Sequence, residues 1–202
     1  MTKVVGITGG IASGKSTVVT MLKEMKFPII DADLIAREVV RVGEEAYEKI
    51  VEHFGSDILL EDHTINRAKL GEIVFNNEKE RLALNAIVHP AVRKRMNEKK
   101  EKWIAAGESV IFLDIPLLFE SKLTNMVEKV LLIYVDEETQ VERLMERNDF
   151  TQEQARSRIA SQMQLKEKKT LSDAVIDNNG SVENTKTQLL EILRNWDIID
   201  EN

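Results

Sequence analysis

The chain contains no cysteine in its 202 residues. This absence excludes disulfide bonds, thiol nucleophiles and metal sites built on cysteine. Proline and glycine are also scarce, with 3 and 9 residues, and they form no linker-like stretch. We find no internal repeat and no low-complexity tract. A chain of this length and composition fits one domain, or one core with a modest insertion.

Long apolar runs are missing as well. The apolar run near the N-terminus, residues 4–7, is too short for a signal peptide. The longest apolar stretch, at 110–119, is interrupted by Asp114 and Pro116. It is far shorter than the segment needed to cross a membrane.

Basic residues are fewer than acidic residues, so the formal net charge is −7. This balance argues against general binding to nucleic acid or to anionic membranes, although it leaves room for a local basic pocket. We therefore expect a cytoplasmic protein with no nucleic-acid partner and no membrane partner. We also expect a monomer or a weak homo-oligomer.

Short apolar runs without polar alternation predict strands that are covered on both faces. Such runs occur at 4–8, 110–114, 130–135 and 173–177, with a briefer one at 27–30. Helical patterns fill the intervals between them. Strands that alternate with helices predict an α/β fold, here a five-stranded parallel sheet flanked by helices.

Several helix ends have recognisable signals. The stretch Thr151-Gln152-Glu153-Gln154 matches a capping box, so a helix should begin at Thr151. Asp136 can cap the preceding helix. Near the end of the chain, apolar residues roughly follow helical spacing and predict a closing amphipathic helix. These residues are Val182, Leu189, Ile192, Leu193 and Trp196.

One interval, residues 32–109, is too long for a simple crossover between strands and has an almost wholly helical pattern. A long charged helix is predicted from about 91 to 106, because Pro90 disfavours helix at His89 and can start the helix that follows. We interpret 32–109 as a helical insertion. Residues 1–31 and 110–202 then form the core.

The stretch GGIASGKST, at 9–17, follows a predicted strand and precedes a predicted helix. Its pattern, G-x-x-x-x-G-K-[ST], lets backbone N–H groups and the positive end of the helix face an anion. Lys15 can reach the β- and γ-phosphates of a nucleoside triphosphate, and Ser16 can ligate Mg²⁺. The sequence therefore predicts a loop that binds ATP together with Mg²⁺.

The remaining motifs favour a kinase over a GTPase. No Asn-Lys-x-Asp guanine-recognition motif is present. The segment 177–180 has the D-x-x-G form of a GTPase switch, but it follows the fourth long strand, so we interpret it as a strand end and a turn. A small kinase needs a base near the acceptor hydroxyl, a carboxylate near the metal and arginines that close over the phosphates.

Carboxylates occupy the expected strand ends. Asp31 and Asp33 follow the second strand, where the binding crevice of an open α/β sheet lies. Helix capping is the alternative role for both, and we favour it for Asp31. Asp114 ends the third strand, which is the position of a metal-side carboxylate. A simple turn carboxylate is the alternative there.

A basic segment follows. Residues 140–170 contain seven Lys/Arg and five Asp/Glu, in a chain that is acidic overall. Arg143 and Arg147 lie one helical turn apart in this segment. We predict a lid at about 138–170, with both arginines facing the phosphates; an ordinary solvated helix pair is the alternative.

His89 and Arg93 could face a cleft of the insertion, or His89 could serve only in packing.

Taken together, the motifs resemble those of the dephospho-coenzyme A kinases. The resemblance spans essentially the whole chain in the expected order. It rests on TGGIASGKST (8–17), DADLIAREVV (31–40), IVHPAVR (87–93), PLLFE (116–120), ETQVERLMERND (138–149) and VIDNNG (175–180). DADLIAREVV and PLLFE are far more specific than the phosphate loop, which many unrelated proteins share.

The resemblance implies transfer of the ATP γ-phosphate to the ribose 3′-hydroxyl of dephospho-CoA, the last step of coenzyme A synthesis. It implies a P-loop kinase core, a helical acceptor domain and a lid. It assigns Asp33 as the base, Lys15 and Arg147 as further catalytic residues, and His89, Arg93 and Leu117 to the acceptor cleft. The phosphates would be held by Ala12, Ser13, Gly14, Lys15, Ser16 and Thr17. Position 12 is alanine where many relatives have glycine, and we expect no effect from it.

Two other functions fit part of the pattern. A kinase of a nucleoside or another small hydroxyl acceptor would share the loop but has no reason to share DADLIAREVV and PLLFE. An ATP-binding regulatory protein without turnover would be expected to have lost Asp33 or the lid arginines, and this chain has both.

Overall fold

The computed structural model describes residues 2–200. They divide into two compact units. We call Asp31–Lys102 the helical unit, and the residues on either side of it together form the sheet unit. No helix among the described residues is both long and apolar enough to cross a membrane.

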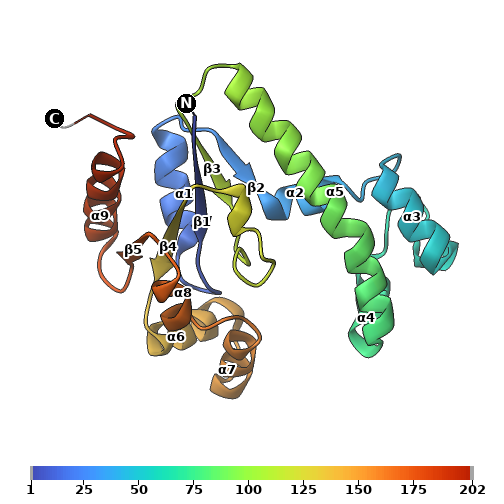
Figure 1. Cartoon of the computed structure of the whole chain (residues 1–202). Helices are drawn as coiled ribbons and strands as arrows, with labels where there is room; N and C mark the ends of the chain where they lie inside the picture. Colours follow the sequence, from blue (N-terminus) through green and yellow to red (C-terminus); the bar gives the residue numbers. More distant parts are fainter. Residues whose placement is uncertain (1, 201–202) are drawn as a thin grey trace. The chain divides into compact units, whose positions relative to one another are not determined.

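The sheet has five strands in the order β2-β3-β1-β4-β5 (Figure 1). Their bounds are β1 Lys3–Thr8, β2 Ile29–Asp31, β3 Val110–Asp114, β4 Lys129–Tyr134 and β5 Ala174–Asp177. β1 pairs in parallel with β3 and β4, and β4 pairs in parallel with β5. The five predicted strands are confirmed. β1, β3 and β4 are buried along most of their length, as expected of strands that are covered on both faces, whereas the outer strands β2 and β5 are only partly buried.

Helices cover the two faces of the sheet. Val5 and Ile7 of β1 face α1 (Lys15–Glu24) and α9 (Val182–Asn195) in one apolar cluster. On the other face, a Cβ at Gly6 would lie 3.2 Å from the side chains of Leu118 and Val127, so this strand position has room for little more than glycine. The predicted closing helix is confirmed.

The inclusion of Val182 in the buried face of the closing helix is wrong. Val182 is the first residue of α9 and its side chain is 62% exposed. Leu189 and Leu193, further along the helix, are fully buried.

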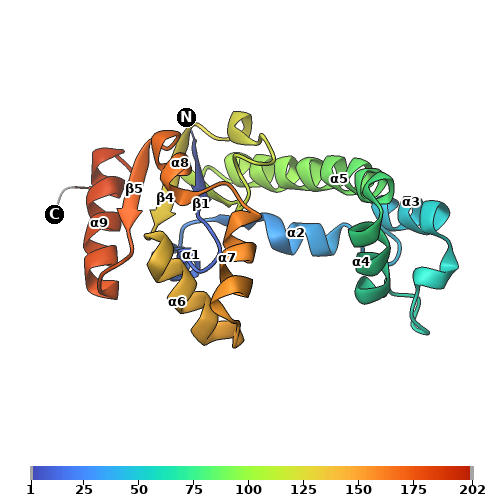
Figure 2. The same ribbon diagram turned by 90° about the horizontal axis from the view of Figure 1, so that it is seen from below.

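Three further helices belong to the sheet unit: α6 (Glu137–Asn148), α7 (Gln152–Ala160) and α8 (Leu165–Thr170). Asp136 caps α6 by accepting from the Thr139 N–H at 2.8 Å, and this hydrogen bond lowers the pKa of the Asp136 carboxyl. Thr151 and Gln154 form the predicted capping box at the start of α7. Figure 2 shows α6 and α7 as a hairpin, joined by a small apolar cluster.

The helical unit contains α2 (Ala32–Glu38), α3 (Glu45–Phe54), α4 (Arg67–Asn76) and most of α5 (Glu78–Ala105). Its core is formed by Ile50, Ile58 and Leu70, against which side chains of α5 pack. A one-turn 3-10 helix, Ser56–Ile58, precedes an isolated antiparallel bridge between Leu59 and Ile65. The helical pattern of this segment was correctly predicted.

The predicted start of the long charged helix is wrong. α5 begins at Glu78, extends for 28 residues and continues through Pro90. Proline has no N–H, so the Ala86 carbonyl lacks its usual donor four residues on. Leu84, Ile87 and Val88 pack against the core just before the proline. This packing stabilises the first half of α5, because tertiary contacts outweigh local propensity in most helices.

Candidate active site

The loop between β1 and α1 has the backbone shape that its glycines predict. Gly14 lies in the left-handed region, with φ 81° and ψ 20°. A Cβ at Gly14 would also lie 2.1 Å from Nδ2 of Asn178. Both the conformation and the space therefore require glycine at this position.

Ala12 also has a left-handed backbone, with φ 59°. We expected the alanine to be without effect because the position is not a fixed glycine of the motif. An L-residue in this conformation costs roughly 1–2 kcal/mol relative to its usual backbone. Ala12 therefore occupies a position where glycine would carry no such strain.

Lys15 forms an ion pair with Asp114 through Nζ and Oδ1. Lys15 is the first residue of α1, and Asp114 is the last residue of β3. The parallel register sets Ile7 of β1 opposite Asp114, which brings the strand-end carboxylate to the loop. The two side chains are only 18% and 8% exposed, so little water screens the pair. Ser16, the next residue, is exposed.

The arginines of the basic segment differ in their surroundings. Arg143, on α6, donates from Nη2 to the Asn178 carbonyl at 2.9 Å, and its Nη1 would lie 3.6 Å from a Cβ at Gly14. It therefore lies beside the loop. Arg147, at the end of α6, is exposed and donates from Nε to Oδ1 of Asn148 at 2.9 Å.

Asn178 is a site residue that the sequence analysis missed. Its Nδ2 donates to the Ser13 carbonyl at 2.8 Å, and its Oδ1 accepts from Oγ1 of Thr185 at 2.6 Å. Asn178 is buried beside the loop. We had interpreted 177–180 as a strand end and a turn and had quoted 175–180 among the family motifs, without giving Asn178 a role. A polar residue directly after a strand of an open α/β sheet lies at the crevice edge.

The residues assigned to the acceptor lie in both units. Asp33 is exposed in the first turn of α2, and Asp31 caps that helix by accepting from the Leu34 N–H at 2.9 Å. His89 and Arg93 are exposed on α5, one turn apart. Leu117, in the turn after β3 of the sheet unit, is 40% exposed.

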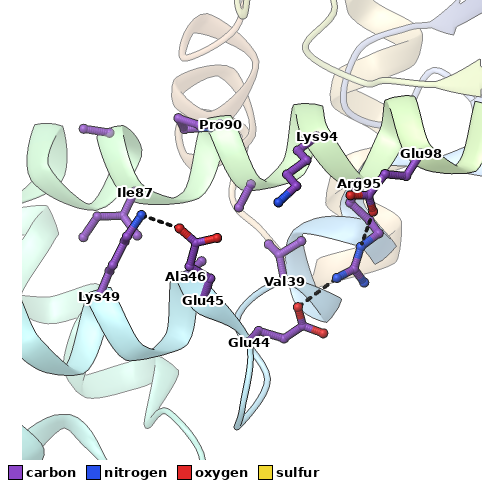
Figure 3. Close-up of a pocket in the computed structure, with 12 residues that line it drawn as sticks. Val39, Glu44, Glu45, Ala46, Lys49, Ile87, Pro90, Lys94, Arg95 and Glu98 are labelled. Carbon is purple, nitrogen blue, oxygen red and sulfur yellow. Dashed lines mark hydrogen bonds and ion pairs between the residues drawn. The ribbon is translucent and has the colours of Figure 1, made fainter.

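The helical unit has a cavity of about 360 Å³ (Figure 3). Its lining combines small apolar residues of α3 and α5 with charged side chains. Arg95 pairs with Glu44 at 2.8 Å and with Glu98 at 3.4 Å. Lys49 pairs with Glu45 at 2.7 Å, and this hydrogen bond lowers the pKa of the Glu45 carboxyl.

Comparison with known proteins identifies the family. A family model described as dephospho-CoA kinase matches residues 3–184. The chain belongs to the dephospho-CoA kinase family. A dephospho-CoA kinase from Bacillus cereus is 59% identical over 200 residues, which cover 99% of this chain and 100% of the relative. The resemblance predicted from the motifs is confirmed.

Solved structures agree with this family assignment. A dephospho-CoA kinase from Campylobacter jejuni matches with a TM-score of 0.75 and 31% identity, over 97% of this chain and 98% of the other. The protein TT1252 from Thermus thermophilus matches with a TM-score of 0.81 and 30% identity, over 96% and 97%. The chain is thus a nucleotide-binding phosphotransferase of the kinase class, with the predicted P-loop kinase fold. A P-loop kinase for another small acceptor is not favoured.

Replacing Gly14 should disable the nucleotide site. In Gly14→Ala, the Cβ would collide with Asn178 and the backbone would be strained, so the loop would shift. We expect ATP affinity to fall on the order of 100-fold, the equivalent of about 2.8 kcal/mol, because the shifted N–H groups no longer point at the phosphates. Calorimetric titration with ATP measures the effect.

Gly43→Ala is the matched control. Gly43 has a similar backbone, with φ 87°, but nothing lies within 4 Å of its Cβ position. This variant should lose about 1–2 kcal/mol of local stability and keep its ATP affinity. Equal ATP affinities in the two variants would contradict the structural account of the loop.

Proposed function

We propose that this protein transfers the γ-phosphate of ATP to the ribose 3′-hydroxyl of dephospho-CoA, giving coenzyme A and ADP. The observation that carries the proposal is the loop with its Lys15–Asp114 pair, in a chain whose residues 3–184 match the dephospho-CoA kinase model. The reaction is the last step of coenzyme A synthesis, and we place it in the cytoplasm.

Incubation with ATP, Mg²⁺ and a panel of hydroxyl acceptors tests the proposed reaction. ADP should form with dephospho-CoA and not with nucleosides or sugars.

In this proposal the sheet unit binds ATP. The N–H groups of Ala12 to Thr17 surround the phosphates, and Lys15 exchanges its contact with Asp114 for phosphate oxygens. Arg143 and Arg147, in the lid at about 138–170, neutralise charge that develops on the transferred group. Because the transition state is loose, positioning and charge neutralisation supply most of the catalysis.

Ser16 and Asp114 suit Mg²⁺ that arrives with the nucleotide. Mg²⁺ usually binds through one or two carboxylates together with phosphate oxygens and water. Residues 2–200 contain no cluster of three or more acidic, histidine or cysteine side chains that could hold a metal. A hydroxyl and a carboxylate next to the phosphate loop fit an ion that shares its ligands with ATP. When bound, the ion neutralises phosphate charge.

The acceptor belongs to the helical insertion, residues 32–109. Asp33 would take the proton of the 3′-hydroxyl, and an exposed carboxylate is accessible for that role. His89, Arg93 and Leu117 would lie along the acceptor cleft. These assignments follow the family motifs in which the residues occur.

The cavity of the helical unit suits the pantetheine arm of the acceptor. This arm is a flexible chain with apolar segments and two amides. The cavity offers apolar walls from Ala46, Ile87 and Ala91. Ala86 and Pro90 also line the cavity.

Asp33→Asn should lower turnover by a factor on the order of 10²–10⁴ because asparagine cannot accept the proton. ATP affinity should not change, since the loop is untouched, and steady-state kinetics combined with ATP titration measure both quantities. Asp31→Asn is the control: asparagine caps helices as well as aspartate, so its turnover should stay near that of the parent. Parent-level turnover in Asp33→Asn would remove Asp33 from the chemistry.

Ala86→Trp should fill part of the cavity while leaving the fold intact, because Ala86 is exposed on α5. We expect the KM for dephospho-CoA to rise about tenfold, the equivalent of about 1.4 kcal/mol. The KM for ATP should stay constant. Leu82→Trp, one turn earlier on α5 and 59% exposed, is the control outside the cavity lining. Equal KM values for dephospho-CoA in the two variants would place the arm elsewhere.

A further inference from the structure

Alternate carbonyls of the phosphate loop are each held by a side chain from outside the loop. Nζ of Lys168 donates to the Gly9 carbonyl at 2.9 Å. Nε2 of Gln140 donates to the Ile11 carbonyl at 2.8 Å. The Ser13 carbonyl is held by Asn178, as described above. The three donors come from α8, from α6 and from the residue after β5.

This arrangement fixes the direction of the loop's N–H groups. In a planar trans peptide the C=O and the following N–H point in opposite directions, and the described residues have no cis peptide bond. The carbonyls of residues 9, 11 and 13 point toward the three side-chain donors. The N–H groups of residues 10, 12 and 14 therefore point toward the opposite side of the loop. The Gly10 N–H reaches Oγ of Ser13 at 3.3 Å. Within residues 2–200, the N–H groups of Ala12 and Gly14 have no protein acceptor.

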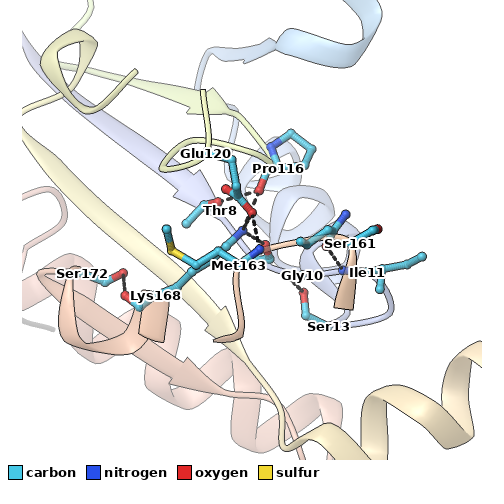
Figure 4. A network of polar contacts seen from close by, with 12 residues as sticks. Thr8, Gly10, Ile11, Ser13, Pro116, Glu120, Ser161, Met163, Lys168 and Ser172 are labelled. Carbon is cyan, nitrogen blue, oxygen red and sulfur yellow. Dashed lines mark hydrogen bonds and ion pairs between the residues drawn. The ribbon is translucent and has the colours of Figure 1, made fainter. Parts of the chain in front are cut away.

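Lys168 is the most unusual of the three holding residues because its side chain is fully buried. Its ammonium has three acceptors: the Gly9 carbonyl, the Pro116 carbonyl at 3.2 Å and Oε1 of Glu120 at 2.9 Å (Figure 4). A buried charge costs several kcal/mol unless it is paired and hydrogen-bonded, and these acceptors satisfy all three of its donors. A neutral side chain at position 168 would fill the same space without the cost of burying a charge, so packing alone does not explain the lysine.

We propose that Lys168, Gln140 and Asn178 are positioning residues of the kinase. By holding the carbonyls of Gly9, Ile11 and Ser13 outward, they present the N–H groups of Ala12 and Gly14 to the phosphates. They act through the loop and do not themselves contact ATP. The proposal rests on the proposed function only in that the loop binds a triphosphate.

The test separates the holding role of Lys168 from its part in a buried ion pair. Lys168→Met alone removes the donor and also leaves Glu120 without its cation. The double variant Lys168→Met/Glu120→Gln removes both charges, so the folding stability lost in the single variant should return. Binding of inorganic tripolyphosphate should nevertheless stay about ten- to a hundred-fold weaker than in the parent, because a hydrogen bond from a charged donor is lost.

Three further measurements complete the experiment. The single variant Glu120→Gln keeps the donor to Gly9 and should bind tripolyphosphate like the parent. The KM for ATP should rise in the double variant while the KM for dephospho-CoA stays constant. A double variant with recovered stability and parent-level tripolyphosphate affinity would make Lys168 structural and overturn the proposal.

A second variant decides the question if the double variant does not fold. Gln140→Met keeps the side-chain length and removes only the donor to Ile11. It should weaken tripolyphosphate binding about three- to tenfold, as expected for a neutral hydrogen bond. Unchanged binding would overturn the proposal. Because tripolyphosphate binding requires no acceptor, a failure of the dephospho-CoA assay would not affect this result.

Discussion

A loop that binds an anion with its backbone must keep its own carbonyl oxygens away from that anion. Each peptide contributes one donor and one acceptor, so a concave surface of N–H groups requires partners for the carbonyls on the convex side. In this protein those partners are side chains of residues far along the chain, including a buried lysine.

The strand order explains how this is achieved. β1 lies in the middle of the sheet, with β3 on one side and β4 on the other. The loop after β1 therefore meets the Asp114 carboxylate from β3 and the helices that follow β4. A parallel sheet places all of these strand ends at one edge, where the binding crevice of α/β proteins lies. The strand order thus brings residues that are far apart in the sequence together at the loop after β1.

The sequence predicted well those features that depend on nearby residues. The strands, the capping box at Thr151 and the glycine at position 14 each follow from burial or backbone conformation within a few residues. The helix start at Glu78 was missed because local proline chemistry argues for a start after Pro90, while packing of Leu84, Ile87 and Val88 settles the outcome.

The supports of the loop could not be predicted in the same way. Lys168 is 159 positions from Gly9, and the sequence analysis counted it only among the cations of the predicted lid. A run of charges does not reveal which one is buried, because burial depends on contacts distant in sequence. Asn178 was hidden in a turn motif for the same reason. The left-handed backbone of Ala12 depends on the folded loop and cannot be predicted from the residue type, because alanine rarely adopts it.

The distance between the motif and its supports bears on how the protein is made. Residues 9–17 leave the ribosome before positions 140, 168 and 178, whose side chains hold the carbonyls of Gly9, Ile11 and Ser13. Domains tend to fold from the N-terminus during synthesis, but here the loop has all three of its supports only when Asn178 has emerged. A nascent chain that ends before Asn178 carries the entire glycine-rich signature without the full set of groups that shapes it. Translation past Asn178, the residue after β5, therefore supplies the last of the three supports of the loop.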